Sequence, residues 1–309
     1  MILSCGEALI DMLPRRTDRG EEAFAPYAGG ALFNTAIAVG RLGAPSGFFS
    51  GLSTDLFGEQ LRAVLGASNV DTSPAHLSPR PTTLAWVRLR DGHATYTFYD
   101  ENTAGRMLGE ADLPALGPEV DALFFGGISL VGDPCGGTFE ALQAREAPAR
   151  VTMIDPNVRQ GFVAFIGDEA AYRARLGRMI ARADIVKASD EDLHWLLGAG
   201  DAGALARGLL AQGPRLVLVT HGAEGAVAHT EGATVRVPAR RVQVADTVGA
   251  GDTFNAGVLV ALHRAGLLTK RAVASLSEDA IRDALALGVR AAAVTVSRPG
   301  ADPPWAHEL

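Results

Sequence analysis

The stretch "DTVGAGDTFNAG", residues 246–257, joins a glycine-rich turn and two aspartates to an apolar helical pattern. Glycine loses more conformational freedom on folding than other residues, so glycines cluster usefully where a chain turns sharply or approaches a ligand closely. Phe254, Val258 and Leu262 follow at helical spacing, which predicts a helix that begins at the turn. We therefore interpret the stretch as a binding loop at a helix N-terminus.

The chemistry of this turn favours a phosphate. Gly249, Ala250 and Gly251 place backbone N–H groups where unpaired donors and the helix dipole attract an anion, and a transferring phosphoryl group fits. Asp252 lies in the same turn and could take a proton from an attacking hydroxyl. The alternative is that Asp252 only caps the helix. Capping does not need Asp246, which could instead hold a cation or orient the turn.

The pattern D-T-x-G-A-G-D-x-F-x-x-G resembles the C-terminal signature of the ribokinase-like carbohydrate kinases, also called the phosphofructokinase B type. The resemblance implies an α/β fold of three layers, α/β/α, with a mostly parallel central sheet and a small β-sheet lid, as one domain over residues 1–309. It implies ATP, Mg²⁺ and a monovalent cation such as K⁺. In this family the first Asp, here Asp246, supports the monovalent-cation site. The backbone of Gly249, Ala250 and Gly251 forms the anion hole, and Asp252 is the catalytic base.

A second segment, "AGGALFNTAIAVGRLG" at 28–43, resembles the N-terminal signature of the same family. In relatives the turn, here Gly29 and Gly30, together with Asn34 and an early acid, here Asp11, binds sugar hydroxyls. A simple turn with a helix cap would also explain the glycines. A solvated acid at the end of a strand would explain Asp11.

The segment "VTHGAEGA", 219–226, resembles the nucleotide-binding loop of these kinases. The resemblance assigns Thr220, Gly222 and Gly225 to the nucleotide, although a plain hairpin explains them almost as well. The segment "AAAVTVSRPGA", 291–301, resembles the C-terminal loop whose carbonyls complete the cation site.

The family motif N-x-x-E, which organises Mg²⁺ through water, is altered here to "SDED". Ser189 replaces the Asn and Asp192 replaces the Glu, so Asp192 is a shorter but still suitable oxygen ligand. The surrounding "KASDED", which begins at Lys187, resembles fructokinases and assigns Lys187 and Ser189 to the nucleotide side. "DPNVR" at 155–159 also resembles fructokinases. Arg159 could clamp a phosphate or the acceptor, or form a surface ion pair.

The remaining chain alternates apolar runs with amphipathic segments, which predicts βαβ units and a mostly parallel sheet covered on both faces. Strands are expected at 2–10 and 293–296, among others, and helices at 32–42 and 278–293. Residues 12–28 and about 80–105 contain alternating strands without helices, with a hairpin turn at Asp91-Gly92. We interpret these two segments as a lid.

Composition excludes several classes. The net charge of −7 without a basic run argues against nucleic acid as a partner. No apolar stretch approaches the roughly 18 residues of a membrane span, and the first residues lack the positive region of a secretory signal. Two cysteines without metal spacing suggest a reduced, cytoplasmic protein. Neither Lys187 nor Lys270 follows a glycine, which excludes a Walker A loop.

One motif is misleading. "GAGDAG", Gly198–Gly203, matches the dinucleotide pattern G-x-G-x-x-G, which would suggest a nicotinamide oxidoreductase. The preceding "SDEDLHWLL" has helical spacing, whereas the true fingerprint follows a strand. A helix end followed by the next helix start explains the match.

The acceptor is inferred from charge near the lid. "FYDENTAGRML", 98–108, presents Asp100 and Glu101 before Asn102, which we place among the sugar-binding residues, and favours a neutral acceptor. We expect transfer of the ATP γ-phosphate to a primary hydroxyl of a neutral sugar, fructose first, with 2-keto-3-deoxygluconate or ribose as alternatives. A non-catalytic sugar or nucleotide sensor is the alternative of another class. Relatives often dimerise through their lids, so a homodimer is expected.

Overall fold

The computed structural model describes residues 1–90 and 93–309. Its largest element is a sheet that contains nine strands within these residues. They are β1 (Ile2–Cys5), β4 (Ser46–Phe49), β6 (Val70–Asp71), β10 (Ala122–Gly126), β11 (Val151–Asp155), β12 (Ile185–Ser189), β13 (Leu216–Thr220), β14 (Ala226–His229) and β15 (Thr234–Val237). The order across the sheet is β15-β14-β13-β12-β11-β10-β1-β4-β6, and only the pairings of β13 with β14 and of β14 with β15 are antiparallel.

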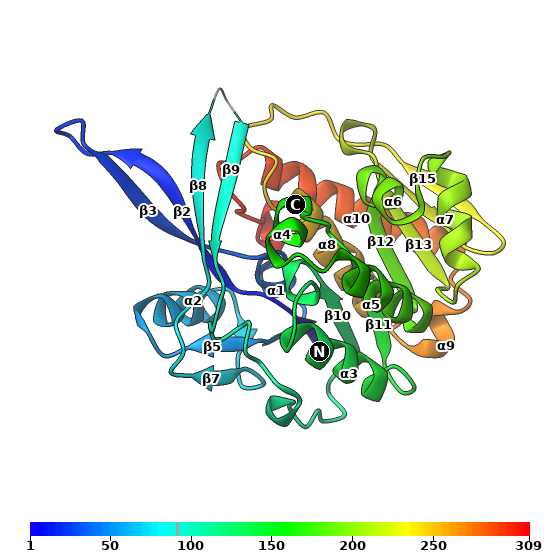
Figure 1. Cartoon of the computed structure of the whole chain (residues 1–309). Helices are drawn as coiled ribbons and strands as arrows, with labels where there is room; N and C mark the ends of the chain where they lie inside the picture. The colour runs from blue at the N-terminus through cyan, green and yellow to red at the C-terminus, as the bar shows by residue number, and fades with distance from the viewer. Residues whose placement is uncertain (91–92) are drawn as a thin grey trace.

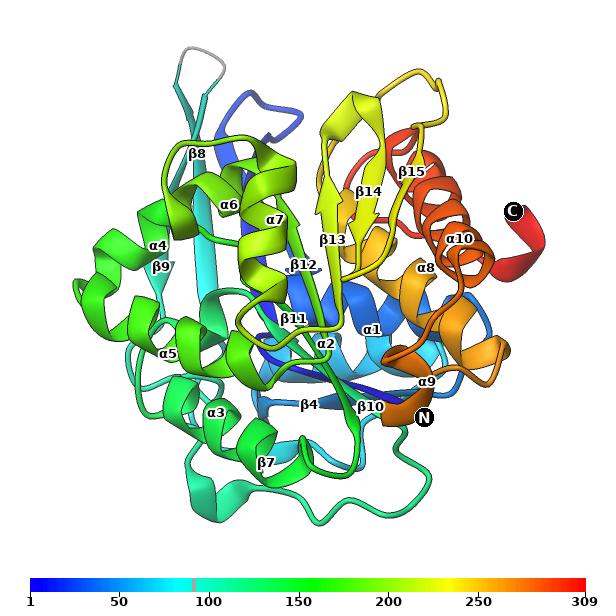
Figure 2. The same ribbon diagram turned by 90° about the vertical axis from the view of Figure 1, so that its right-hand side faces the viewer.

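Helices cover both faces of this sheet, and Figure 2 shows the strands between the two helical layers. Successive residues of each strand point to opposite faces, so Ile2 joins one apolar core and Leu3 the other. The first core contains α1 (Ala31–Arg41), α2 (Leu56–Ala67), α8 (Ala250–Arg264), α9 (Lys270–Val273) and α10 (Glu278–Val296). The second contains α3 (Cys135–Glu146), α4 (Gln160–Ile166), α5 (Glu169–Arg182), α6 (Asp190–Leu197) and α7 (Ala202–Leu210). The predicted three-layer α/β/α fold is confirmed.

A smaller sheet projects from one side of the main body (Figure 1). Its order is β3-β2-β8-β9, formed by β2 (Leu9–Arg16), β3 (Glu22–Gly29), β8 (Leu84–Arg90) and β9 (His93–Tyr99). The expected segments 12–28 and 80–105 contain most of it, but the first strand already begins at Leu9. The turn predicted at Asp91-Gly92 lies outside the described residues. A short pair, β5 (Gly51–Ser53) and β7 (His76–Ser78), lies at the base.

Two strand predictions were wrong. The apolar run 2–10 is not one strand, because the chain leaves the large sheet after Cys5 and joins the small sheet at Leu9. The run 293–296 belongs to the last turn of α10, although its residues favour strands. There tertiary packing overrides local propensity, since Thr295 Oγ1 donates to Thr253 Oγ1 of α8 at 3.0 Å.

The remaining turns agree with simple capping chemistry. "GAGDAG" joins α6 to α7, as predicted, with Gly198 at φ 88° and the Asp201 side chain accepting from Ala204 N. Short 3-10 turns are η1 (Glu110–Asp112), η2 (Ile128–Leu130), η3 (Gly222–Glu224) and η4 (Ala306–Glu308), of which η2 and η3 follow the strands β10 and β13 closely. Within the described residues, no helix combines the length and the apolar character that crossing a membrane demands.

Candidate active site

The candidate residues gather at the carboxyl edge of the large sheet, where parallel α/β sheets usually bind ligands. Gly126 at the end of β10 pairs with Asp155 at the end of β11. Ser189 at the end of β12 pairs with Thr220 at the end of β13. The start of α8 meets this edge, because Asn255 in its second turn donates to Asp155 Oδ2 at 2.7 Å.

Asp252 is the central side chain of the cluster. Gly249, with φ 77°, is the N-cap of α8, so Asp252 lies inside the first turn and the capping interpretation is wrong. Its carboxylate is buried and accepts from Asn34 Nδ2 at 2.9 Å and from Asn157 Nδ2 at 3.5 Å. Thr35 Oγ1 donates to its backbone oxygen at 3.1 Å. Asn34 and Thr35 therefore attach α1 to the start of α8.

The burial of Asp252 changes its acidity. Loss of water raises the pKa of this carboxyl to about 7, although the Asn34 hydrogen bond and the charge of Arg159 both lower it. A carboxylate with a pKa near 7 can take a proton at neutral pH and release it again. The environment therefore suits a general base.

A buried cation lies beside this base. Lys187 Nζ forms an ion pair with Asp155 Oδ2 at 3.0 Å, and both side chains are buried. Burial opposes the charge, but the carboxylates of Asp155, Asp192 and Asp252 more than offset it and raise the pKa of Lys187. A Cβ on Gly251 would lie 3.2 Å from Lys187 Nζ. Lys187 thus lies directly against the predicted anion-binding turn.

Asp246 connects this turn to the C-terminal loop. Its Oδ1 accepts from Val248 N at 3.1 Å, and its Oδ2 accepts from Gly300 N at 2.9 Å. A Cβ on Gly249 would approach the Cβ of Ala301 to 2.7 Å. The two segments expected to form a monovalent-cation site are therefore in contact.

The predicted sugar-binding residues surround the entry to α1. Gly30 is the N-cap of that helix at φ 118°. A Cβ on Gly29 would lie 2.5 Å from Asp11 Oδ2, so the turn closely contacts this acid. Asp11 lies within β2, and burial raises the pKa of its carboxyl to about 6. It is not the solvated strand-end acid of the alternative interpretation.

Ser189 and Asp192 form a reciprocal capping box at the start of α6. Ser189 Oγ accepts from Asp192 N at 3.0 Å, while Asp192 Oδ2 accepts from Ser189 N at 3.0 Å and from its hydroxyl at 2.8 Å. Asp192 Oδ1 accepts from Val158 N at 2.9 Å. Among the described residues, no cluster of three or more His, Cys, Asp or Glu is placed to hold a metal.

The predicted nucleotide loop divides into two kinds of residue. Gly225 closes the β13–β14 hairpin, since its Cβ would meet Val237 O at 2.2 Å, and the turn geometry accounts for it. Gly222, at φ 50°, has open space where a Cβ would project. Thr220 is half-buried at the sheet edge. Gly222 and Thr220 are the positions that a ligand can reach.

Two other predicted residues lie at the margins. Arg159 is exposed at the N-cap of α4, yet its charge lowers the pKa of Asp252, which places it within electrostatic range of the base. Asn102 is exposed in a left-handed conformation, φ 59°, and does not join the buried cluster.

The small sheet faces the cluster with the side that carries Asp11. In the strand register, Asp11 lies opposite Ala85, which in turn lies opposite Phe98. Val87 lies opposite Tyr96, so the side chains of Asp11, Tyr96 and Phe98 share one face of the sheet. Burial and the charge of Asp11 raise the pKa of Tyr96, and Arg159 lowers it. The Phe98 ring packs against Phe162 of α4 with centroids 4.8 Å apart.

One premise about the acceptor was wrong. Asp100 is buried and accepts from Arg106 Nη1 at 3.1 Å and from Thr83 Oγ1 at 3.1 Å. It therefore presents no free negative charge, whereas its neighbour Glu101 is exposed. Because Arg106 is paired with Asp100, its positive charge is largely neutralised as well.

Comparison with known proteins agrees with this geometry. The family described as pfkB family carbohydrate kinase matches residues 1–308. This chain belongs to that family. The chain is 59% identical over 283 residues to a fructokinase of Rhizobium leguminosarum bv. trifolii, which covers 92% of this chain and 86% of the relative.

Two solved structures are also similar to this pfkB-family chain. The fructokinase of Xylella fastidiosa with bound ATP is 29% identical, with a TM-score of 0.86 over 97% of this chain and 93% of its own. The fructokinase of Vibrio cholerae O395 in fructose, ADP and calcium ion bound form is 27% identical, with a TM-score of 0.83 over 97% and 94%. A double mutant of the latter contains fructose, ADP and a potassium ion.

Sequence reasoning missed three residues of this kinase-family site. Asp155 and Asn157 stand in "DPNVR", where only Arg159 was considered, and Asn255 follows the Gly-rich turn directly. Asp155 accepts from Lys187, Asn157 donates to Asp252, and Asn255 donates to Asp155. The feature that singles out Asn157 is structural and not visible in the sequence, since its backbone adopts φ 43°, a value that residues other than Gly, Asn and Asp rarely adopt.

Proposed function

We propose that this chain is an ATP-dependent fructokinase that phosphorylates a primary hydroxyl of the sugar. The observation that carries the proposal is the buried Asp252 carboxylate, held by the amides of Asn34 and Asn157 at the first turn of α8. Fructokinases similar over nearly the whole chain support the choice of reaction and acceptor.

In the proposed step the acceptor oxygen attacks the γ-phosphorus of ATP while its proton passes to Asp252. The bond from the γ-phosphorus to the bridging oxygen breaks, and ADP leaves with that oxygen. Backbone N–H groups of Gly249, Ala250 and Gly251 stabilise the developing negative charge, because first-turn donors have no acceptor inside their own helix. Lys187 adds positive charge on the inner side of the turn.

We assign the remaining predicted roles by position. Ser189, Thr220 and Gly222 line the sheet edge on the donor side, and Asp11 with the Gly29-Gly30 turn lies on the acceptor side. Arg159 supplies an exposed positive charge between them. We assign the small sheet as a lid that excludes competing water, within a single domain.

Mg²⁺ would neutralise charge on the donor phosphates. Asp192 already accepts three hydrogen bonds, from Val158 N, Ser189 N and the Ser189 hydroxyl, so it fits an outer role through water and not a direct ligand position. An outer role for Asp192 agrees with the tendency of Mg²⁺ to keep several of its coordinated waters.

A monovalent cation such as K⁺ would add positive charge behind the anion-binding turn. Asp246 holds the turn and the 296–301 loop together, which suits this role. We expect Asp246→Asn to lose stimulation by KCl over an equal concentration of choline chloride, measured as initial rate. Equal stimulation of both proteins would remove Asp246 from the cation site.

A neutral acceptor is still favoured, although the reason is the pairing of Arg106 and not a free negative charge on Asp100. An acidic sugar such as 2-keto-3-deoxygluconate gains most from an unpaired cation. Arg106 is paired with Asp100, and we assign the exposed Arg159 to the donor phosphates. Fructose carries no charge that needs such a partner. We therefore place fructose before 2-keto-3-deoxygluconate and ribose.

The test is ADP release with a panel of fructose, 2-keto-3-deoxygluconate and ribose, using wild type and Asp252→Ala. Fructose turnover in wild type that is lost in the variant supports the kinase and its base. Faster turnover of the acidic sugar would overturn the acceptor assignment. Wild type that binds ATP or sugar but turns over no sugar would instead support a sensor.

A further inference from the structure

Glu7 is a half-buried carboxyl that the proposed reaction does not use. It lies in the short segment between β1 and β2, where the chain passes from the large sheet to the small one. Its Oε1 accepts from Ala31 N at 2.9 Å, and its Oε2 accepts from Ser129 N at 3.4 Å. Glu7 thus connects two segments that are distant from it in sequence.

The first segment is the entry to α1. The N-cap Gly30 has no side chain that could accept from the first N–H groups, so Glu7 supplies the missing acceptor. A carboxylate is also favoured at this position by the helix dipole. A Cβ on Gly30 would lie 2.7 Å from the Glu7 backbone oxygen, so the turn and Glu7 are in direct contact.

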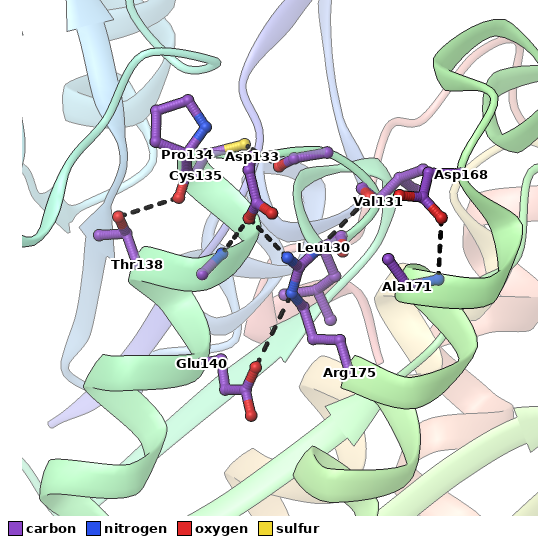
Figure 3. A network of polar contacts seen from close by, with 12 residues as sticks. Leu130, Val131, Asp133, Pro134, Cys135, Thr138, Glu140, Asp168, Ala171 and Arg175 are labelled. Carbon is purple, nitrogen blue, oxygen red and sulfur yellow. Dashed lines mark hydrogen bonds and ion pairs between the residues drawn. The ribbon is translucent and has the colours of Figure 1, made fainter.

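The second segment is the turn after β10. A Cβ on Gly127 would lie 2.3 Å from Glu7 Oε1, so this turn also packs directly on the carboxyl. In α5, Arg175 Nη1 also donates to Leu130 O at 2.8 Å, and Arg175 Nη2 contacts Asp133 Oδ1 at 2.5 Å. Figure 3 shows these contacts from α5. Glu7 and Arg175 therefore both contact the chain at or just after this turn.

The α1 contact leads to the catalytic carboxyl. Ala31, Asn34 and Thr35 are three and four positions apart, so they lie on one side of the helix. Asn34 and Thr35 hold the side chain and the backbone of Asp252. In the described part of the chain no hydrogen bond joins Glu7 to Asn34 or Thr35, so we trace its effect on Asp252 through the position of α1.

We propose that Glu7 is a positioning residue for phosphoryl transfer, which fixes the first turn of α1 and the Gly126–Leu130 turn so that Asn34 aligns Asp252 with the acceptor hydroxyl. The inference rests on the proposed kinase function. It predicts that loss of the Glu7 carboxylate impairs the sugar side of the reaction and leaves ATP binding intact, because Lys187 and Thr220 do not contact Glu7.

The test compares Glu7→Gln and Glu7→Ala with Glu146→Ala. Glu146 is the control, a carboxylate outside the site that accepts from Arg145 at 2.7 Å and from Arg150 and lies at the far end of α3. We expect Glu7→Gln to lower kcat/KM for fructose by about 10- to 100-fold, with an unchanged KM for ATP. Glu7→Ala should lower it further, and Glu146→Ala should keep the wild-type value. Thermal unfolding of all three identifies a fold defect.

A double-mutant cycle separates positioning from general stabilisation. If Glu7 acts through Asn34, the losses of Glu7→Gln and Asn34→Ala are not additive in kcat/KM. Additive losses, or a Glu7→Gln protein that behaves like Glu146→Ala, would overturn the inference. Hydrogen exchange at residues 30–35 should quicken in Glu7→Gln and not in Glu146→Ala, and unchanged exchange would also contradict it. Wild type without sugar turnover would instead contradict the proposed function.

Discussion

Burial makes the negative charge of Asp252 unfavourable and so raises its pKa, and the raised pKa makes the side chain useful as a base. Its carboxylate is buried under α1 and keeps only amide donors as partners, apart from the nearby charges of Lys187 and Arg159. A carboxyl in water has too little affinity for a proton to accept one effectively at neutral pH. Burial raises that affinity.

The first prediction concerns pH. Because the pKa of Asp252 is raised to about 7, the base is protonated and inactive below that pH. We expect kcat/KM for fructose to fall by about tenfold for each pH unit below 7 and to level off above it. Initial rates between pH 5 and 9 in buffers of constant ionic strength test this. A flat profile down to pH 5 would contradict the assignment.

The second prediction concerns Asp252→Asn. It should lower kcat by about 10²- to 10⁴-fold, because proton transfer loses its acceptor. The folded-state pKa lies above the ordinary value of 3.8, so ionising the group costs stability increasingly as pH rises toward about 7. The neutral amide avoids this cost, so the variant should melt higher than wild type at pH 8 and gain little at pH 4. An equal gain at both values would show that the charge is not responsible.

The turn before α8 depends on one backbone conformation. Gly249 has φ 77°, a left-handed value that strains any residue with a Cβ, and Ala301 leaves no room for one. This geometry sets the start of α8, whose Asn255 reaches Asp155 at the carboxyl edge of the sheet. The turn before α8 and the C-terminal loop at 300–301 therefore pack as one unit, and a side chain added at Gly249 would displace that loop.

The third prediction is that Gly249→Ala lowers the free energy of unfolding by about 1–2 kcal/mol from the left-handed conformation alone, and lowers activity further. Gly208→Ala is the control, since Gly208 lies within α7 with no atom within 4 Å of an added Cβ. Alanine there should stabilise the helix by up to about 1 kcal/mol. Denaturant titration measures both, and equal effects would refute the conformational explanation.

The small sheet has two different faces. One carries Asp11 and Tyr96 toward the site, and the other carries Phe24, Trp86 and Tyr99 away from it. Phe24 and Trp86 pack with ring centroids 4.5 Å apart, and Tyr99 is 59% exposed. An exposed aromatic face of this kind is typical of interaction surfaces. We propose that a second copy of the chain covers it.

The fourth prediction follows from this surface. Phe24→Glu combined with Tyr99→Glu should convert a dimer to a monomer, because charge at the centre of an apolar interface has no partner. Leu197→Glu changes a similarly exposed apolar side chain at the end of α6 and should leave the dimer intact. Sedimentation velocity over a range of concentrations distinguishes the species. A wild-type monomer at all concentrations would end the proposal.

The whole molecule also shows which features local sequence can reveal. The three layers, the helix after the Gly-rich turn and the helical junction at "GAGDAG" depend on periodicity and capping within a few residues, so they were predictable. The 293–296 prediction failed because packing of α10 on α8 outweighed the local preference of a β-branched run. The prediction of one strand over 2–10 failed because the chain leaves the large sheet after Cys5 and pairs in the small sheet from Leu9, a change of partner strands that no local pattern marks.

The sequence alone determined that Asp252 stands at a helix start behind a glycine turn, because those residues are adjacent in the chain. Only the tertiary structure decided what surrounds it, since Asn34 is 218 residues away and Asn157 is 95. The same holds for Glu7, whose contact with Ser129 spans 122 residues, and for Asp100, which Arg106 neutralises. Acidity and charge in a site depend on neighbours in space, which folding assembles from segments that no local pattern connects.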